Sequence, residues 1–238
     1  MASTSTTEGR RGLRRAVLVG ALAAALAACG VGVPRLAPIP ANPASIDGDG
    51  SLSMSGSGGS GRARFSFVLL PPDRARIDVF DPLGRLAYFF LVSGDEALLA
   101  VPSKKAFGRG GRDEVFARFL GFGLSPDELA SLLTGRWTHA PAGPDAASEA
   151  DWILGRDAQG RVASAEKGGL RFEVLDFFRD SAAPRRIAFE HPDSRGRLKI
   201  NRLAFDRLPP GAADEAALLK GYGERSWPEM EALLGDED

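Results

Sequence analysis

The only cysteine of this chain, Cys29, is the residue whose type and position most clearly suggest covalent chemistry. It follows a basic start, with arginines at positions 10, 11, 14 and 15, and an apolar run over residues 16–28. About a dozen apolar residues are too few to span a hydrocarbon core as a helix, which needs roughly 20. A basic start, a short apolar core and small residues before a cleavage site are typical of a secretory signal peptide. We therefore predict a signal peptide over residues 1–28.

Residues 26–29 (LAAC) resemble the bacterial lipobox. In that motif the peptidase cuts before the cysteine, whose sulfur carries a diacylglyceryl group, so Cys29 is the predicted lipidation site. One acyl chain gives only reversible membrane binding, whereas the three chains of a bacterial lipoprotein make release very slow. Gly30 stands where an aspartate would resemble an inner-membrane retention signal, which favours the outer membrane. The alternative is an ordinary signal peptide followed by a chance cysteine.

The other residue types that could do chemistry form no catalytic or metal-binding pattern in the sequence. His139 and His191 each lie near a proline, without a second histidine or a cysteine at metal-ligand spacing, and we predict ordinary surface residues. The glycine clusters at residues 56–61 (GSGGSG) and 108–111 (GRGG) lack the Lys-Ser/Thr of a phosphate-binding loop, and we predict turns. The sequence thus predicts no catalytic residues, no metal ligands, no cofactor and no enzymatic activity.

The composition indicates one globular domain without disulfides. The chain has 238 residues and a formal net charge of −1, whereas a nucleic-acid-binding domain would be strongly basic. With Cys29 acylated, no thiol remains for a disulfide, so the fold must be stabilised by its core. The residues that follow the signal peptide suffice for one sizeable core.

Period-two alternation of apolar and polar residues dominates the chain and predicts strands. In residues 74–80 (RARIDVF), Ala75, Ile77 and Val79 lie on one face, opposite the charged residues. Residues 86–92 and 97–101 are apolar on both faces, so we expect a cover on their outer side. A shift of apolar parity after residue 200 predicts a β-bulge. The predicted strands are residues 52–54, 63–69, 74–80, 86–92, 97–101, 152–156, 161–167, 170–176, 185–190 and 198–205.

Helices interrupt and follow these strands. Residues 113–120 carry apolar side chains on one side, and a second helix starts at Ser125, where Ser125 and Glu128 form a capping box, and ends at Gly135. Two short helices are predicted over residues 214–220 and 227–234. Hairpins, a helical insertion and further hairpins predict an α+β fold. It is a strongly curved antiparallel sheet, or unclosed β-barrel, with the helices packed as a lid on the concave face.

We expect four segments along the chain. They are the signal peptide (1–28), the lipidated cysteine with a Pro-rich tether (29–47), the half-barrel domain (48–208) and a helical acidic tail (209–238). The tether is rich in Pro, Ala and Gly and has no hydrophobic period.

One face of the predicted sheet carries many large apolar side chains, which has two interpretations. The helices can close a filled core over them, or the curved sheet can remain incompletely filled and receive an apolar ligand such as acyl chains. The residues expected to line this face, and the cavity if there is one, are Phe65, Phe67, Ile77, Val79, Tyr88, Phe90, Phe172, Val174, Ile187 and Phe189.

Three parts of the sequence resemble the outer-membrane lipoprotein receptor of the lipoprotein-localisation system (LolB-like) and related lipoproteins of the LolA–LolB superfamily. Residues 76–84 (RIDVFDPLG) resemble a family strand that ends in Pro-Leu-Gly. Residues 119–137 resemble the family's helical insertion, and residues 185–187 and 198–200 its closing strands. The resemblance covers about two thirds of the chain and includes the lipobox, while the tail after residue 205 is longer than the family's usual end.

The resemblance implies a monomeric, membrane-anchored lipoprotein at the periplasmic face of the outer membrane. It would bind the acyl chains of lipoproteins in an apolar cavity, receive them from a periplasmic carrier and deliver them to the outer membrane. The family's exposed membrane-insertion leucine matches Leu83 of the Pro-Leu-Gly turn. The alternative is a structural or interaction lipoprotein of an envelope complex that uses the same fold without ligand transfer.

Overall fold

The computed structural model describes residues 33–56, 59–137, 152–208 and 215–235. The chain divides into two compact units, Met1–Pro34 and Arg35–Asp238. All the described strands and helices, and the apolar clusters that they bury, belong to the second unit. This unit therefore contains its own core, and the predicted signal peptide and Cys29 lie outside the described residues.

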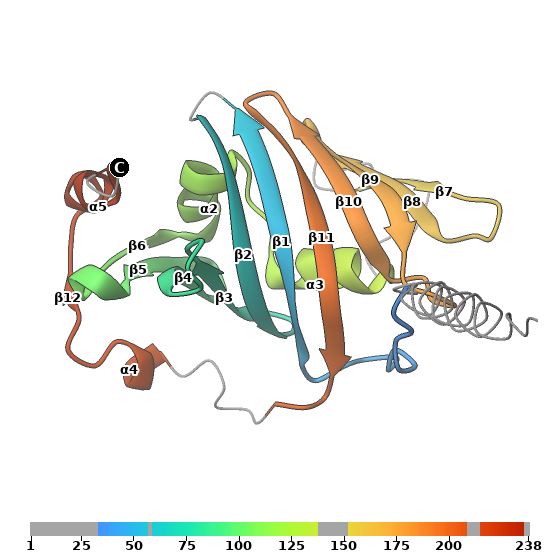
Figure 1. Cartoon of the computed structure of the whole chain (residues 1–238), viewed down its shortest axis with the longest axis horizontal. Coiled ribbons are helices and arrows are strands. Elements are labelled where there is room, and N and C mark those ends of the chain that lie inside the picture. The colour runs from blue at the N-terminus through green and yellow to red at the C-terminus, as the bar shows by residue number, and fades with distance from the viewer. Residues whose placement is uncertain (1–32, 57–58, 138–151, 209–214, 236–238) are drawn as a thin grey trace, which may run out of the picture. The chain divides into compact units, whose positions relative to one another are not determined.

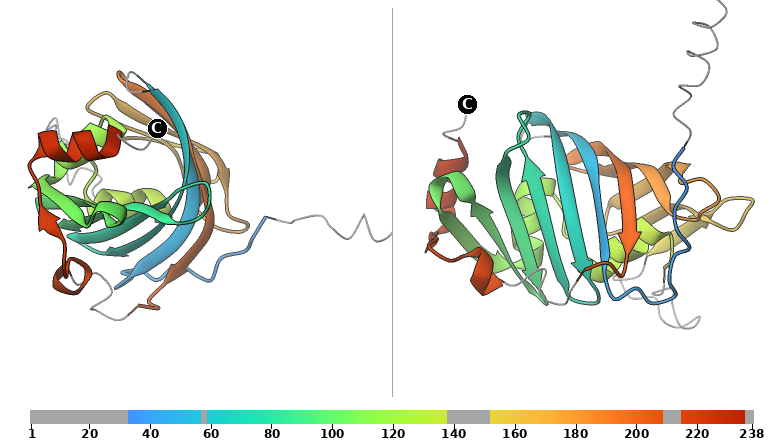
Figure 2. Two further views of the ribbon diagram at one scale, coloured as in Figure 1. Left: turned by 60° about the vertical axis from the view of Figure 1, so that its left-hand side comes forward. Right: turned by 60° about the horizontal axis from the view of Figure 1, so that its bottom comes forward.

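The second unit is built on one strongly curved sheet, coloured from blue through green to orange in Figures 1 and 2. Its strand order is β12-β6-β5-β4-β3-β2-β1-β11-β10-β9-β8-β7, and all neighbours are antiparallel except β12 and β6. This arrangement confirms the predicted curved antiparallel sheet. The strands are β1 (Ile46–Gly56), β2 (Gly59–Leu70), β3 (Arg74–Phe80), β4 (Leu86–Ser93), β5 (Glu96–Val101), β6 (Ala106–Gly111), β7 (Ile153–Arg156), β8 (Val162–Lys167), β9 (Leu170–Phe177), β10 (Pro184–His191), β11 (Ser194–Phe205) and β12 (Gly223–Glu224).

The predicted bulge lies in β11. Ile200 pairs with Gly50 of β1, and Arg202 pairs with the adjacent Asp49, so one extra residue of β11 has no partner. Leu203 therefore returns to the inner face, where it is buried with Ile200. β1 itself starts at Ile46, so the last two residues of the range predicted as tether belong to the sheet.

The prediction of a turn at residues 108–111 is wrong, because these residues belong to β6. β6 pairs with β5 along its whole length and with β12 on its other side. Its glycines are required by packing: a Cβ at Gly108 would lie 2.9 Å from Met230, and one at Gly110 would lie 3.2 Å from Trp227. The first glycine cluster is also partly sheet, since β2 starts at Gly59.

Two helices lie on the inner face of the sheet, as the left view of Figure 2 shows: α2 (Arg112–Leu120) and α3 (Pro126–Thr134). The capping box predicted at α3 is present. The Ser125 hydroxyl accepts from the Glu128 N–H, and the Glu128 carboxylate accepts from the Ser125 N–H. Gly135 ends the helix in the left-handed conformation that glycine tolerates.

The C-terminal segment follows the edge of the sheet at β6. Its elements are α4 (Glu215–Leu218), β12 and α5 (Trp227–Gly235). Leu218 and its neighbours pack on an outer apolar cluster of β4, β5 and β6, whereas Met230 of α5 is fully buried in the main inner cluster. The part of this segment around α4, with Leu218, Leu219 and Tyr222, is the cover expected on the outer side of the strands that are apolar on both faces. A short 3-10 helix (Pro102–Lys104) joins β5 to β6.

Candidate functional site

The inner face of the sheet and the two helices enclose an apolar cavity of about 210 Å³. Strands β1 to β4 and β9 to β11 contribute one wall, and α2, α3 and the loop between them contribute the other. Apart from the hydroxyl of Tyr88, the lining side chains carry no polar nitrogen or oxygen atom. They are Leu52, Met54, Ala63, Phe65, Phe67, Leu69, Ile77, Val79, Tyr88, Phe90, Phe116, Phe119, Leu120, Phe122, Leu124, Leu129, Leu132, Leu133, Phe172, Ile187, Phe189 and Leu198.

The structure brings together all but one of the residues that the sequence assigned to this face. Val174 is the exception: it pairs with Ile187 across β9 and β10 but does not line the cavity. The sequence did not assign the helical residues to the cavity, although their apolar stripes were visible. Phe122 and Leu124 were missed altogether, because a loop between two helices has no period that reveals which residues point inward.

The helical layer touches the sheet through aromatic contacts. Phe90 of β4 stacks on Phe116 at 5.5 Å between ring centroids and meets Phe119 edge-on at 5.4 Å. In the loop after α2, Phe122 meets Phe189 of β10 at 5.4 Å. Aromatic pairs at these separations add to the free energy of burial, so the cavity lies between well-packed contacts on both sides.

The cavity is small for a ligand site. Small-molecule pockets typically enclose about 300–1,000 Å³, and 210 Å³ equals the volume of about seven water molecules. A long acyl chain would fill this space and still require more. A long acyl chain bound here would therefore have to extend beyond the cavity or displace α2, α3 or the loop between them.

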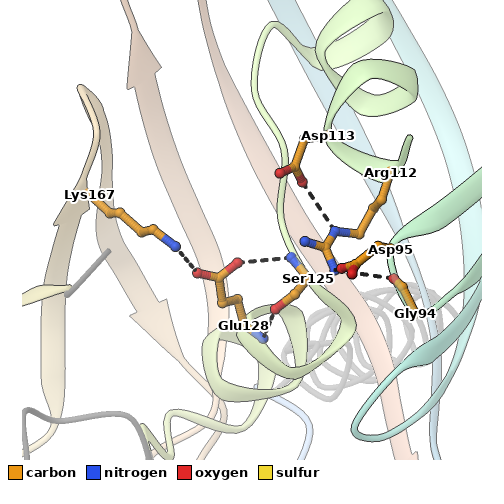
Figure 3. A network of polar contacts seen from close by, with 7 residues as sticks. All are labelled: Gly94, Asp95, Arg112, Asp113, Ser125, Glu128 and Lys167. Atoms are coloured by element: carbon orange, nitrogen blue, oxygen red, sulfur yellow. Dashed lines mark hydrogen bonds and ion pairs between the residues drawn. The ribbon is translucent and has the colours of Figure 1, made fainter. Parts of the chain in front are cut away.

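Polar contacts fix α3 to the sheet, as Figure 3 shows. Glu128 accepts hydrogen bonds from the Lys167 ammonium of β8 at 2.6 Å, from Trp152 Nε1–H at 2.9 Å and from the Ser125 N–H at 2.9 Å. Burial disfavours the charged carboxylate and raises its pKa, but these three donors outweigh burial, so the pKa of Glu128 lies below its ordinary value. The ionised form of Glu128 is thus stabilised by folding.

A second set of contacts fixes α2 near the other edge of the sheet (Figure 3). The Arg112 guanidinium donates to the Gly94 carbonyl in the β4–β5 turn at 3.2 Å, and the Arg112 N–H donates to the Asp95 carbonyl at 2.8 Å. The end of α2 is held by the Ser194 hydroxyl, which donates to the Leu120 carbonyl at 2.8 Å. The two helices are therefore attached at separate places.

His191 differs from the sequence prediction of a surface residue. It is half-buried with its ring 5.9 Å from that of Phe122, and its Nδ1 is buried without a hydrogen-bond partner among the residues that the structure describes. His139 lies outside the described residues. Within the described ranges, no cluster of three His, Cys, Asp or Glu residues could hold a metal ion.

Leu83 lies in the turn between β3 and β4 with 77% of its surface exposed. The turn is ordered by Asp81, which accepts hydrogen bonds from the Arg85 N–H at 2.9 Å and from its guanidinium at 2.7 Å. Gly84 has a φ of +83°, which lets the chain reverse directly after Leu83. The leucine is thus held out in solvent by a defined turn. Within the part of the chain that the structure describes, no helix is long and apolar enough to cross a membrane.

The sequence matches no protein-family model and no curated protein. Solved structures do match, each at 13% sequence identity. A DUF1329 family protein from Desulfovibrio piger has a TM-score of 0.51 over 75% of this chain and 92% of that one. A putative outer membrane lipoprotein-sorting protein domain from Vibrio parahaemolyticus has a TM-score of 0.52 over 74% and 92%. A LolA superfamily protein from Nitrosomonas europaea has a TM-score of 0.50 over the same shares.

The chain has the LolA-like fold. This finding agrees with the fold implied by the sequence resemblance. The matched structures belong to the wider LolA superfamily and to the DUF1329 family, and none of their names specifies a LolB-like receptor.

The Glu128 contacts lead to a prediction about stability and pH. The pKa of Glu128 is lower in the folded state than its ordinary value of 4.5. The stability that Glu128 contributes is therefore fully present above about pH 4.5, and it is lost as the pH falls through the folded-state pKa. Glu128→Gln should lower the free energy of unfolding by about 1–3 kcal/mol at neutral pH, since hydrogen bonds to a charged group are lost. It should also reduce the loss of stability in acid.

Urea unfolding of residues 35–238 at neutral and acid pH measures both effects. Glu166→Gln is the matched control, because Glu166 is exposed on the same strand as Lys167, and it should behave as the unaltered protein. Equal stabilities of the Glu128→Gln variant and the unaltered protein at neutral pH would contradict the role of Glu128.

Proposed function

We propose that this protein is a membrane-anchored lipoprotein of the LolA–LolB superfamily that binds the acyl chains of other lipoproteins and delivers them to the outer membrane. The observation that carries the proposal is the cavity between sheet and helices, which is lined almost wholly by carbon atoms. Such a lining gives no hydrogen bonds to a polar ligand and favours an acyl chain through the hydrophobic effect. The LolA-like fold and the lipobox at Cys29 support the same function.

In this scheme, α2, α3 and the loop between them move away from the sheet when an acyl chain binds. A chain that enters the cavity separates Phe119 and Leu129 from the sheet and replaces their contacts with its own methylene groups. The chain is held by apolar contacts alone, so uptake and release need no covalent chemistry. Transfer from a carrier to this protein and then to a membrane requires only successively more favourable free energies for the same chain.

Leu83 is the residue proposed to contact the membrane. Transfer of an exposed leucine side chain from water into the acyl region of a membrane is favourable by about 1.5–3 kcal/mol of free energy. Together with the lipid proposed at Cys29, it would bring the cavity to the membrane into which the cargo is released.

The small volume of the cavity favours a second candidate function. A core that is nearly filled by its own side chains suits a structural or interaction lipoprotein of an envelope complex, which uses the fold without a ligand. The two functions differ in whether the cavity accepts an acyl chain at all.

The first test narrows the cavity without unfolding the protein. Ala63 lines the cavity on β2 and is partly buried, so Ala63→Leu adds three carbon atoms to the space that the ligand needs. We expect about a tenfold or greater loss of affinity for a fluorescent fatty acid, which corresponds to about 1.4 kcal/mol. Displacement titrations on residues 35–238 measure this affinity, and thermal unfolding checks that the fold is kept.

Ala188→Leu is the matched control, because Ala188 is a half-buried alanine on the outer face of β10. It should bind the probe with unaltered affinity. If the unaltered protein neither binds the probe nor accepts an acylated lipoprotein from a carrier, the cavity is a filled core and the structural function is the better account.

Leu83→Glu separates delivery from binding. The substitution should leave probe affinity unchanged, because Leu83 is outside the cavity. It should slow the release of a bound lipoprotein into vesicles by roughly 10–100-fold, since the membrane contact of about 1.5–3 kcal/mol is lost. Ile153→Glu, at an equally exposed apolar residue of the edge strand β7 (74% exposed), is the control. Equal delivery by both variants and the unaltered protein would remove the role given to Leu83.

A further inference from the structure

The outer face of the sheet carries a band of cations over its central strands β2, β1, β11 and β10, which Figure 1 shows side by side. The register places Arg62 and Arg197 on either side of Ser53, and Arg64 and Lys199 on either side of Ser51. Since neighbouring strands lie about 4.8 Å apart, the two rows of cations are about 10 Å apart with serines between them. We call this band the cationic stripe; its members are Arg62, Arg64, Arg186, Arg195, Arg197 and Lys199.

The cationic stripe is exposed and largely unneutralised. Of its members, only Arg186 lies within ion-pair distance of a carboxylate of the described residues, at 3.5 Å from Asp176. Arg195 donates to the Ser55 hydroxyl at 3.4 Å. Glu190 pairs with Arg195 in the register of β10 and β11, so one carboxylate lies beside this end of the stripe. Most other arginines of the sheet and helices have an acidic partner, such as Arg202 with Asp47 at 2.7 Å. In a chain of net charge −1, this band is a local excess of positive charge.

Two grooves follow the stripe. One is lined by Ser53, Ser55, Arg62, Arg195 and Arg197 among others, and the second by Ser51, Arg64, Arg186 and Lys199 among others. Guanidinium groups and hydroxyls are strong hydrogen-bond donors to phosphate oxygens. The grooves thus offer charge and donors suited to a phosphate group that approaches the sheet from outside.

Apolar side chains border the second groove. Phe80, Pro82 and the 43%-exposed Leu175 line it, together with Asp81, whose carboxylate is paired with Arg85 at 2.7 Å. A Cβ at Gly84 would lie 2.9 Å from Arg64 Nη2, so the Arg64 guanidinium reaches the turn that carries Leu83. Cations and exposed apolar side chains on one surface are typical of proteins that bind the interface of an anionic membrane, where the cations contact headgroups and the apolar residues enter the acyl region.

We propose that the cationic stripe binds the phosphate-bearing headgroups of anionic phospholipids, and so places the outer face of β2, β1 and β11 against the membrane beside Leu83. An acidic protein surface would account for the charge, but it does not account for Leu83 and Leu175 at the border. The stripe lies on the face opposite the cavity. The proposal therefore extends the membrane contact proposed for Leu83 and does not depend on acyl binding.

The experiment compares the binding of residues 35–238 to two kinds of vesicle, phosphatidylcholine alone and phosphatidylcholine mixed with phosphatidylglycerol, by flotation at low and high salt. The test variant is Arg62→Ser/Arg197→Ser/Lys199→Ser. The control variant, Lys104→Ser/Lys220→Ser/Arg225→Ser, removes the same charge from exposed residues outside the stripe. Thermal unfolding and fatty-acid probe affinity of both variants show that fold and cavity are unchanged.

The unaltered protein should bind the phosphatidylglycerol vesicles more tightly, and high salt should weaken this binding. Each cation near an anionic surface raises the membrane partition coefficient roughly fivefold. Removing three cations of the stripe should therefore lower the partition coefficient on the order of 100-fold, and the control variant should lower it only a few-fold. Equal binding of the unaltered protein to both vesicles would overturn the proposal. Equal losses in the two variants would also overturn it, because general charge rather than the stripe would then be responsible. In either case, unchanged probe affinity would leave the proposed function of the cavity intact.

Discussion

Burial of a long, curved apolar face under two short helices is the constraint on which the rest of this structure depends. Helices α2 and α3 have nine residues each and are therefore about 14 Å long. The central strands β1 and β2, of 11 and 12 residues, extend over about 36–40 Å. The helices cannot cover such a face completely. Aromatic side chains, such as Phe116, Phe119 and Phe122, fill part of the space between the helices and the sheet. The space that they leave unfilled is the cavity.

The same constraint explains the C-terminal segment. β6 lies next to the two-residue edge strand β12. Its inner side carries Gly108 and Gly110 rather than large side chains, so apolar cover for this part of the sheet must come from another element. Met230 and Trp227 of α5 pack against these glycines, while Leu218 and Leu219 pack with the outer apolar cluster. Pairing of β12 with β6 occupies part of the exposed backbone of the edge strand, which reduces its tendency to pair with another chain.

Much of this fold follows from local sequence patterns. Alternation identified most strands, the capping box located the start of α3, and the parity shift located the bulge in β11. The strand at Gly108 was not predictable in this way, because the residues that define its inner face are contributed by α5, more than a hundred positions later in the chain. Likewise, alternation identified the sheet side of the cavity. It could not predict that Val174 lies beyond the cavity, nor which loop residues point inward, since these depend on how the layers pack.

The cavity and the outer face suggest a division of roles within one sheet. The inner face is apolar and covered by helices that are attached separately, α3 through Glu128 and α2 through Arg112. Over β2, β1, β11 and β10 the outer face is polar, carries the cationic stripe and borders the turn with Leu83, whereas over β4, β5 and β6 it is apolar and covered by the C-terminal segment. The proposed transfer of acyl chains from a carrier to a membrane would require both a protected apolar space and a surface that contacts lipid. Alternation of side chains along each strand places the cavity residues and the cationic stripe on opposite faces of the same sheet.

The central claim is that acyl chains occupy the space between the sheet and the helices. The most direct measurement is to illuminate residues 35–238 with a photoreactive fatty acid and to map the labelled residues by mass spectrometry. The account predicts saturable labelling of lining residues on both layers, such as Phe65 on β2 and Leu129 on α3, that an excess of unlabelled fatty acid suppresses. Labelling confined to the outer surface, or labelling that does not saturate, would contradict it.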